Sequence, residues 1–354
     1  MRARYVGTAC IAAALFGFGA WQRDRLPGWL KPVQATSVPE PQPPPEPPPG
    51  PVRIVAVGDL MLGTNVKAVI RKHGARHPFR KYRKLLEGAD IAFGNLETPL
   101  SDRGAPTPGK SKESLRNHTN FIFRAPPACA AGLAWAGFDI VSLANNHAMD
   151  FGPEALRDTL ESLEEAGIAV IGGGANLDRA YAPHFLERNG QRIALLGISD
   201  ILPAFSEAGK ERPGIAPARG KEFEARMPDA IAAARKEADQ VIVSVHWGKE
   251  RFTGATPKQR KLGRRLIDWG ADLVIGHHTH CMGPVERYGG GLIHYSLGNF
   301  VSYTGSRANV EAWEVVLRPG EEPEQASHVY RWDGKYLNAR REDTPGLKTA
   351  SARR

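Results

Sequence analysis

Cysteine is scarce in this chain of 354 residues, which contains only Cys10, Cys129 and Cys281. Three cysteines cannot form a disulfide framework, and nothing in the spacing of Cys129 and Cys281 requires these two to pair. We expect both thiols to be free and buried. The hydrophobic share of 42% and the charged share of 24% are ordinary for a globular protein, so disorder is not expected over most of the length.

Two common catalytic motifs are also missing. No Gly-x-Ser-x-Gly sequence occurs, which argues against a serine hydrolase built on a nucleophile elbow. The run Gly172-Gly173-Gly174 is not followed by Lys-Ser or Lys-Thr, so it is better explained as a turn after a strand than as a phosphate-binding P-loop. The sequence also has no apparent internal repeat.

The positive charge of the chain does not indicate a nucleic-acid partner. The formal net charge is +9, but residues 1–51 contribute +2 and residues 335–354 contribute +4, which leaves only +3 for the part between them. Basic residues in the tails say little about what a folded domain binds. We therefore expect no binding to nucleic acid.

The N-terminus is typical of an exported protein that stays in the membrane. Arg2 and Arg4 precede an apolar run, Tyr5–Trp21, without a charged residue, an order that keeps the basic end in the cytoplasm. The run is near the short limit for a bilayer span and lacks a clear cleavage site, so an uncleaved signal anchor over residues 1–32 is favoured over a cleaved signal. Residues 33–51, VQATSVPEPQPPPEPPPGP, predict a polyproline spacer that ends where the domain begins.

Alternating strand and helix patterns predict an α/β fold with a largely parallel sheet for residues 52–335. Past Arg318 we expect only short, polar elements, and residues 336–354 are expected to form a basic, disordered tail. The predicted strands are Val52–Asp59, Ile91–Phe93, Ile140–Leu143, Ala169–Ile171, Ile193–Gly197, Val241–His246, Leu273–Ile275 and Leu292–Ser296, and the predicted helices are Pro153–Gly167, Phe223–Glu237 and Pro257–Gly270.

Polar side chains follow most of these strands, at the end where ligands gather in α/β sheets. A lone histidine there is more often structural, and Asn-Asn commonly forms turns, but the conjunction of so many predicts a site. Oxygen and imidazole ligands without a thiolate suit Mn, Fe or Zn. The residues are Asp59, Asn95 and Glu97 in GNLETPL, Asn145, Asn146 and His147 in ANNHAMD, His246, then His277, His278 and His280 in GHHTH, and Asn299 in SLGNF.

These motifs resemble the poly-γ-glutamate capsule biosynthesis proteins of the CapA type, which are distantly similar to calcineurin-like metallophosphoesterases. The resemblance implies a four-layer α/β/β/α sandwich with an N-terminal transmembrane anchor and an extracytoplasmic domain. It runs from about residue 52 to about residue 302 and rests on Gly-Asp, Gly-Asn-Leu-Glu, Asn-Asn-His, His-Trp-Gly and Gly-His-His-x-His, with support from FIFRAPP, AGFDIVSLANNHAMDFG, LIDWGADLVIGHHTH and HYSLGNF.

Residue by residue, the resemblance implies a site with two divalent ions about 3.5–4 Å apart that share a hydroxide. Asn146 would bind the second ion and His147 would stabilise the reacting oxyanion, whereas His277 would lie behind the ligands. The full set of candidate metal ligands is Asp59, Asn95, Glu97, Asn146, His246, His278 and His280.

Three positions depart from the related patterns. Met61 replaces a histidine of the metallophosphoesterase pattern, and Asn95 replaces its bridging aspartate. Neutral asparagine is a poor bridge between two cations, so either Glu97 reaches in instead or the site binds its metal weakly or holds only one ion. Thr279 stands where capsule proteins commonly have proline, a change that we expect to be mild.

Two functions remain open at this point. In the first, the protein is a metal-dependent hydrolase or transferase that acts on a phosphoester or amide of an anionic envelope polymer. In the second, it is a non-catalytic subunit that binds such a polymer or helps to assemble a capsule synthase. Trp247 either lines a substrate groove or packs in the core, and Arg124 either meets an anionic substrate or is an ordinary surface or salt-bridged arginine.

Overall fold

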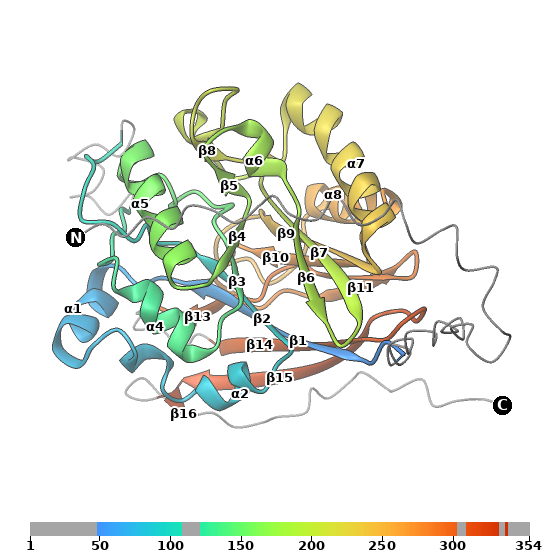
Figure 1. Ribbon diagram of the computed structural model, residues 1–354, viewed down its shortest axis with the longest axis horizontal. Helices are drawn as coiled ribbons and strands as arrows, with labels where there is room; N and C mark the ends of the chain where they lie inside the picture. The colour runs from blue at the N-terminus through green and yellow to red at the C-terminus, as the bar shows by residue number, and fades with distance from the viewer. Residues whose placement is uncertain (1–47, 108–120, 303–308, 333–336, 339–354) are drawn as a thin grey trace, which may run out of the picture. The chain divides into compact units, whose positions relative to one another are not determined.

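The computed structural model describes residues 48–107, 121–302, 309–332 and 337–338 (Figure 1). The predicted signal anchor and most of the proline-rich spacer lie outside these ranges. Within them, no helix is both long enough and apolar enough to cross a bilayer. The end of the spacer is already held by the domain, since the backbone N–H of Gly50 donates to the carbonyl of Asn189 at 2.7 Å.

The first sheet has the strand order β16-β15-β14-β1-β2-β3-β4, with β13 paired to β1 beside this path. Strands β1 to β4 and β13 run parallel, whereas β14, β15 and β16 add an antiparallel meander at one edge. The strands are β1 (Val52–Leu60), β2 (Ile91–Leu96), β3 (Ile140–Ser142), β4 (Ala169–Ile171), β13 (Asn299–Val301), β14 (Asn309–Leu317), β15 (Glu324–Trp332) and β16 (Leu337–Asn338).

The second sheet has the order β11-β12-β10-β9-β7-β6, and a small separate sheet pairs β5 with β8. Its four inner strands are parallel, and the two outer strands are antiparallel to their neighbours. The bounds are β5 (Gly173–Gly174), β6 (His184–Arg188), β7 (Gln191–Ser199), β8 (Gly214–Ile215), β9 (Gln240–His246), β10 (Leu273–His277), β11 (Val285–Tyr288) and β12 (Gly291–His294).

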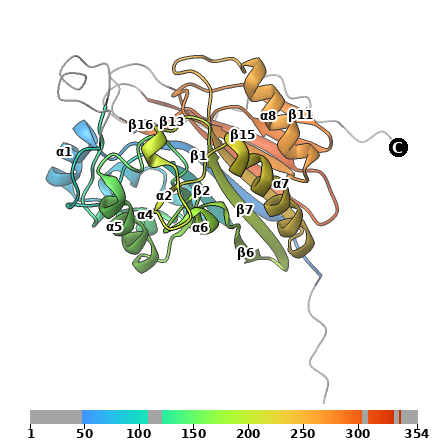
Figure 2. The ribbon, with the colours of Figure 1, turned by 90° about the horizontal axis from the view of Figure 1, so that it is seen from above.

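The helices follow from local signals in the sequence. Helix α8 begins with a capping box, in which Thr256 and Gln259 bond each other's backbone N–H groups, and with proline in its first turn. Figure 2 shows α4 and α5 on one side of the strands and α7 and α8 on the other. The helices are α1 (Thr64–His73), α2 (Arg83–Glu87), α4 (Cys129–Ala136), α5 (Gly152–Glu165), α6 (Leu177–Tyr181), α7 (Gly220–Glu237) and α8 (Pro257–Asp268), with short 3-10 turns η3 (His77–Phe79) and η4 (Ala204–Ser206).

Three clusters of buried apolar side chains hold the elements together. One joins side chains of both sheets, among them Phe93 and Ile275. A second lies between the first sheet and α1, α4 and α5, and a third between the second sheet and α6, α7 and α8. The inner strands of both sheets can therefore bury both faces, which explains the continuous apolar runs in the sequence. The predicted α/β fold is confirmed.

The region after Arg318 differs from the prediction. Strand β15 is nine residues long and pairs with β14 from Glu324 to Arg331, so the expectation of only short elements there was wrong. Two residues of the predicted tail, Leu337 and Asn338, pair with the end of β15. The sequence of β15, EQASHVYRW, has little of the apolar alternation that predicts a strand, and pairing with the antiparallel neighbours β14 and β16 stabilises it.

Candidate metal centre

The candidate ligands meet because neighbouring parallel strands end at the same level. Asp59 of β1 lies opposite Asn95 of β2 and opposite Asn299 of β13. In the second sheet, His246 of β9 lies opposite His277 of β10. Loops that leave these strand ends then bring the remaining polar side chains to the same place, as is general for ligand sites in α/β sheets.

Two buried carboxylates and one imidazole form the centre of the site. One ligand atom each from Asp59, Glu97 and His280 lies within 4.8 Å of the others. The Oδ2 atom of Asp59 is 3.1 Å from Nδ1 of His280, and the same nitrogen is 2.9 Å from Oδ1 of Asn299. Both carboxylates are completely buried, which a protein accepts only where partners or a cation compensate the charge.

Asn95 occupies the middle of this group with its amide nitrogen toward the carboxylates. Its Nδ2 atom donates to Oδ1 of Asp59 at 2.8 Å and to Oε1 of Glu97 at 3.2 Å. Its Oδ1 atom accepts a hydrogen bond from Nδ2 of Asn145 at 3.1 Å. The asparagine therefore joins the two carboxylates by hydrogen bonds, and its oxygen, the atom able to bind a metal, faces Asn145.

His246, Asn146 and His278 lie beside the carboxylates. The Nε2 atom of His246 is 2.9 Å from Oδ1 of Asn146 and 3.4 Å from Oε1 of Glu97. The rings of His246 and His278 are 4.7 Å apart, and those of His278 and His280 are 6.0 Å apart. His278 and His280 have φ values of +91° and +57°, a backbone conformation that is uncommon for histidine and is frequent at functional sites.

His277 lies deeper than the predicted ligand pair but close to the first carboxylate. Its Nδ1 atom is 3.5 Å from Oδ1 of Asp59, and its side chain is completely buried. Its ring packs against Phe93 with a centroid distance of 5.8 Å. His277 therefore lies between Asp59 and the core, and its place behind the ligands stays a prediction.

The pKa values of the two buried carboxyl groups are shifted in opposite directions. Burial by itself would raise the pKa of Asp59, but the nearby ring of His277 and the contact with His280 hold it well below its usual range. The pKa of Glu97 is raised well above its usual value by burial and then by the charge of Asp59. Two carboxyl groups in one buried cluster thus differ strongly in acidity, as is common at functional sites.

The pKa values of the histidines are also shifted in opposite directions. Burial would lower the pKa of His280, but the bond to Asp59 and the charge of Glu97 raise it to about 10. Burial, and then the positive charge of His280, lower the pKa of His278 to about 4. Burial followed by the charge of His278 also lowers the pKa of His246 well below its usual value. His246 and His278 are therefore neutral at physiological pH, which is the form that binds metals.

The donor set fits a divalent metal ion. Several buried atoms of the site have no hydrogen-bond partner, namely Oε2 of Glu97, both ring nitrogens of His277 and Nδ1 of His278. A buried polar atom without a partner costs about 1–3 kcal/mol, and native proteins avoid the situation unless a water or ion satisfies the atom. Carboxylate and imidazole donors without thiolate suit Zn, Mn or Fe.

His147 is held at the edge of the site by a carboxylate that sequence reasoning missed. Its Nδ1 atom is 2.9 Å from Oδ2 of Asp150, which also accepts the backbone N–H of Phe123 at 2.7 Å. The ring of Phe123 packs on His147 at 4.3 Å, and Asn145 accepts the backbone N–H groups of His147 and Ala148. Because these contacts fix the ring on several sides, His147 is pre-oriented.

Trp247 and Arg124, for which the sequence left two roles open, both support the fold. Trp247 is buried, and its Nε1 atom donates to the carbonyl of Tyr295 at 2.9 Å, so it packs in the core. Arg124 donates to the carbonyls of Arg103 and Gly104 and stacks on Phe151, which makes it a loop-holding residue.

The cysteines and the substituted threonine are also accounted for. Cys129 and Cys281 are both free; Cys129 is buried and Cys281 is partly exposed, so burial of both thiols was only half right. The hydroxyl of Thr279 donates to the carbonyl of Cys281 at 2.8 Å and accepts a hydrogen bond from the hydroxyl of Ser296 at 2.8 Å. Its hydroxyl thus supports the turn that carries His278 and His280.

Comparison with known proteins gives a consistent family. Residues 53–304 match the family described as bacterial capsule synthesis protein PGA_cap. The capsule biosynthesis protein CapA of Bacillus anthracis is 33% identical over 247 residues, which are 69% of this chain and 58% of that protein. The PGA biosynthesis protein CapA of Bacillus subtilis is 34% identical over 246 residues, or 69% of this chain and 62% of that protein.

A third relative, named "Probable polyglutamine synthesis accessory protein", comes from Mycobacterium tuberculosis and is 30% identical over 252 residues. The match with it covers 69% of this chain and 64% of that protein. The chain thus spans about three fifths of the length of these relatives. Among solved structures, a hypothetical protein from Thermus thermophilus covers 79% of this chain and 99% of its own, with 19% identity and a TM-score of 0.46.

Proposed function

Because the chain belongs to the family of bacterial capsule synthesis proteins, we propose that it acts in the synthesis of an anionic envelope polymer of the poly-γ-glutamate kind. The domain would work outside the cytoplasm, periplasmic or extracellular, tethered to the cell membrane by the N-terminal run Tyr5–Trp21. The names of the relatives, which refer to capsule, PGA or polyglutamine synthesis, support the process. Synthase subunits are the protein partners that this role calls for.

The proposed activity is metal-dependent hydrolysis or group transfer at a phosphoester or amide bond of the polymer. The observation that carries it is the buried convergence of Asp59, Glu97 and His280. Two divalent ions, when bound, would lower the pKa of a water molecule and neutralise charge on the reacting oxygens. The residues that would hold them are Asp59, Glu97, Asn146, His246, His278 and His280, with Asn95 as a further candidate.

In this proposal the side chains of the protein orient the substrate and supply a proton to the reacting oxygen. His147 would donate a hydrogen bond or proton to the reacting oxygen, and Asp150 would hold the proton on Nδ1 so that the other ring nitrogen is presented. We also propose that the two sheets and their helical covers form the four-layer sandwich of calcineurin-like metallophosphoesterases. The three separate apolar clusters support that arrangement.

A non-catalytic role is the second candidate, and one observation favours it. The amide nitrogen of Asn95 donates to both carboxylates, so hydrogen bonds alone already link Asp59 to Glu97. Met61, where a histidine would stand in the metallophosphoesterase pattern, gives its backbone N–H to Val301 at 2.7 Å and has no oxygen or imidazole donor in its side chain. A subunit with such a site would bind polymer or support synthase assembly without turnover.

Complementation separates the two candidates. A host that makes the polymer and lacks this protein would receive the wild type, His278→Ala, or His184→Ala as a histidine control on β6. We expect His278→Ala alone to lose polymer production, bound metal and turnover of polymer fragments by the purified protein. Normal polymer production by a stable His278→Ala protein would contradict any role that depends on the site, whereas lost production without any wild-type turnover would favour the non-catalytic role.

A further inference from the structure

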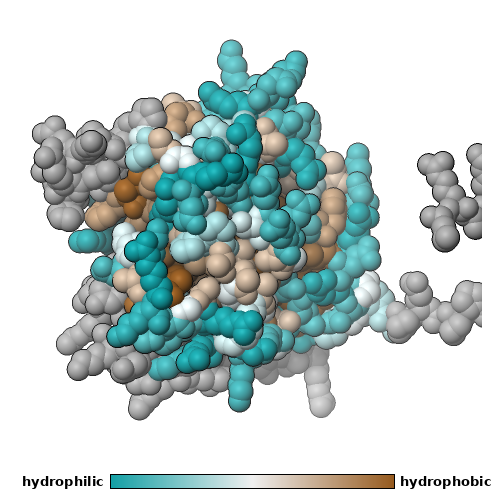
Figure 3. All heavy atoms as spheres, turned by 60° about the vertical axis from the view of Figure 1, so that its left-hand side comes forward, coloured by the Kyte–Doolittle hydropathy of each residue, from teal (hydrophilic) through white to brown (hydrophobic). Residues whose placement is uncertain are grey.

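A strongly basic surface lies over α1, η3 and α2. Eight lysine and arginine residues occur between Lys67 and Lys84, and no aspartate or glutamate occurs between Leu60 and Leu86. Six of them have exposed side chains and define what we call the basic face: Arg71, Lys72, Arg76, Arg80, Lys81 and Lys84. Figure 3 brings forward the side of the molecule that carries α1 and α4, where hydrophilic side chains surround a paler area.

Four of these six side chains have no acidic partner among the residues that the structure describes. In the described part of the chain, Arg83 bonds Glu87 through Nε at 2.6 Å, but Arg71, Lys72, Arg80 and Lys84 form no ion pair. The pKa of His77, beneath the face, is lowered by burial and by the positive charges of His73 and Arg80.

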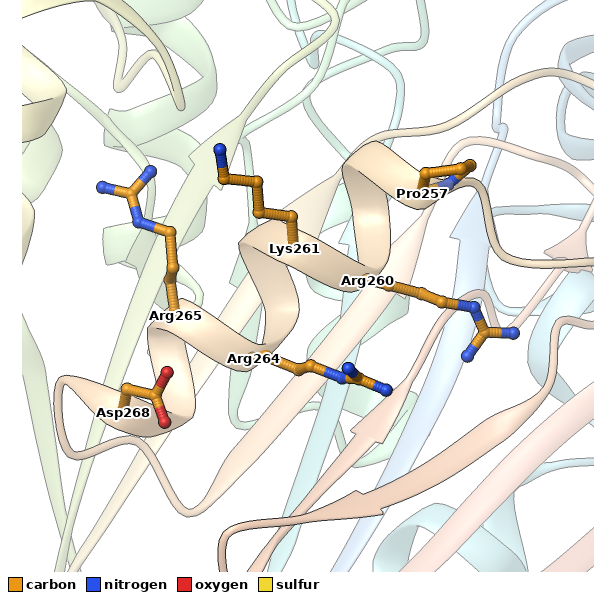
Figure 4. Close-up of a pocket in the computed structure, with 6 residues that line it drawn as sticks. All are labelled: Pro257, Arg260, Lys261, Arg264, Arg265 and Asp268. Atoms are coloured by element: carbon orange, nitrogen blue, oxygen red, sulfur yellow. The ribbon is translucent and has the colours of Figure 1, made fainter.

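Helix α8 is equally rich in basic residues but differs in this respect. Figure 4 shows its arginines around a cavity of about 460 Å³ that lies away from the metal centre. Arg260 and Arg264 both pair with Glu286, and Arg265 pairs with Glu224. The arginines of α8 therefore serve the packing of the domain, and the basic face stands out by comparison.

The basic face is rigidly mounted. A Cβ atom on Gly132 would lie 2.6 Å from the carbonyl oxygen of Ala75, so α4 touches the backbone of the turn between α1 and η3. The guanidinium groups of Arg76 and Arg83 stack over the ring of Trp135 at 5.4 and 4.5 Å. Phe79 and Tyr82 are completely buried. The backbone that carries the charges is therefore fixed, which limits the entropy that this segment loses on binding a ligand.

The face also lies within reach of the metal centre along the chain. Helix α1 starts five residues after Asp59, and a Cβ on Gly63 just before it would lie 3.1 Å from Phe123, the residue that packs on His147. The ten residues of α1 span about 15 Å. An extended α-linked residue spans about 3.5 Å, and a γ-linked glutamate repeat is longer because it has two more backbone carbons. A handful of repeats therefore bridges that distance.

We propose that the basic face binds the polycarboxylate chain of the envelope polymer and holds it beside the metal centre. The identity of the polymer rests on the proposed function; the binding surface rests on the charges of Arg71, Lys72, Arg80 and Lys84. A carboxylate polymer repeats one negative charge per residue, which matches a row of lysine and arginine side chains better than a single small anion does. Binding of this kind weakens steeply with salt.

Polymer binding by the full-length protein in detergent tests the proposal, with labelled poly-γ-glutamate of one defined length as the probe. The test variant is Arg71→Gln/Lys72→Gln/Arg80→Gln/Lys84→Gln. The control, Lys210→Gln/Lys221→Gln/Lys236→Gln/Lys261→Gln, changes the charge by the same amount on other exposed sites. Since each basic residue near an anionic surface contributes roughly fivefold, the loss of four should lower affinity at low salt on the order of 600-fold. We expect only a slight loss in the control.

An equal loss in both variants, or no loss in the test variant, would overturn the proposal. So would unchanged polymer binding together with lost binding to phosphatidylglycerol vesicles, because the face would then serve the membrane surface. Asp59→Ala should keep polymer binding. The metal content and thermal stability of the fourfold test variant and of the fourfold control should equal those of the wild type. A loss of polymer binding without a loss of metal then concerns the basic face alone, so failure of this proposal is distinguished from failure of the metal-centre proposal.

Discussion

An Asn95→Asp substitution should make the stability of the metal centre depend much more strongly on a bound cation. In the wild type, Nδ2 of Asn95 donates to Asp59 at 2.8 Å and to Glu97 at 3.2 Å. The variant places a carboxylate oxygen at the position of that donor. Three acidic side chains would then face one another in a site from which water is excluded.

The energetic cost can be worked from these distances. Two unit charges 2.8 Å apart repel by about 6 kcal/mol at an effective dielectric constant of 20. Uptake of a proton limits the cost to about 4 kcal/mol at pH 7, because a normal aspartate must be protonated some three pH units above its pKa. The folded state then binds a proton that the unfolded state lacks, so the stability deficit grows as pH rises from about 4 to 7 and vanishes at lower pH.

Thermal unfolding in EDTA at pH 4.5 and pH 7 measures this deficit. We expect the melting temperature of Asn95→Asp to fall by roughly 10 °C at pH 7 and by much less at pH 4.5, and added Mn²⁺ or Zn²⁺ to stabilise the variant more than the wild type. Asn176→Asp, which keeps the N-cap of α6, is the matched control. Wild-type stability of Asn95→Asp in EDTA at pH 7, or a deficit that shrinks with rising pH, would refute the reasoning.

Two further predictions concern the support of the site and the fold. Asp150→Ala leaves the backbone N–H of Phe123 and the ring of His147 without their acceptor. Urea unfolding should therefore show a free energy of unfolding lower by about 2–3 kcal/mol, whereas Glu161→Ala, at an exposed position, should change it very little. Equal stability of the two variants would contradict this. Burial would raise the pKa of Glu286, but bonds from Tyr295 and Arg264 hold it below its usual value, so its carboxylate stabilises the fold above its unfolded pKa and loses that effect as pH falls through the folded value. Glu286→Gln should therefore lower the free energy of unfolding by about 1–3 kcal/mol at pH 7. The free energy of unfolding of this variant should also fall less steeply than that of the wild type as the pH is lowered, and an equally steep fall would count against the prediction.

The strand ends were predictable because their signal is local. Continuous β-branched runs mark strands buried on both faces, and a polar residue directly after such a run must lie at the sheet edge. This reasoning brought Asp59, Glu97, His246 and His280 together before any geometry was available. It gave no orientation for Asn95, since which amide atom faces Asp59 depends on Asn145, which follows a different strand.

Other features depend on long-range contacts or on signals that were overlooked. Strand β15 owes its conformation to pairing with β14. The β6–β7 hairpin turns at Asn189 and Gly190, with φ values of +51° and +75°, and Asn-Gly is a hairpin signal that the sequence carried. Asp150 lies three residues after His147, and only the folded turn shows that its side chain returns to the ring. The basic face was hidden because net charge was summed over a whole domain.

The metal content of the purified full-length protein tests the central claim most directly. It should be measured by mass spectrometry after loading with Mn, Fe or Zn, beside Asp59→Ala, His278→Ala and the control His184→Ala. We predict about two equivalents of divalent metal in the wild type and the control, and a loss in the two site variants. A wild-type protein that remains folded under the loading conditions and binds no metal would contradict it.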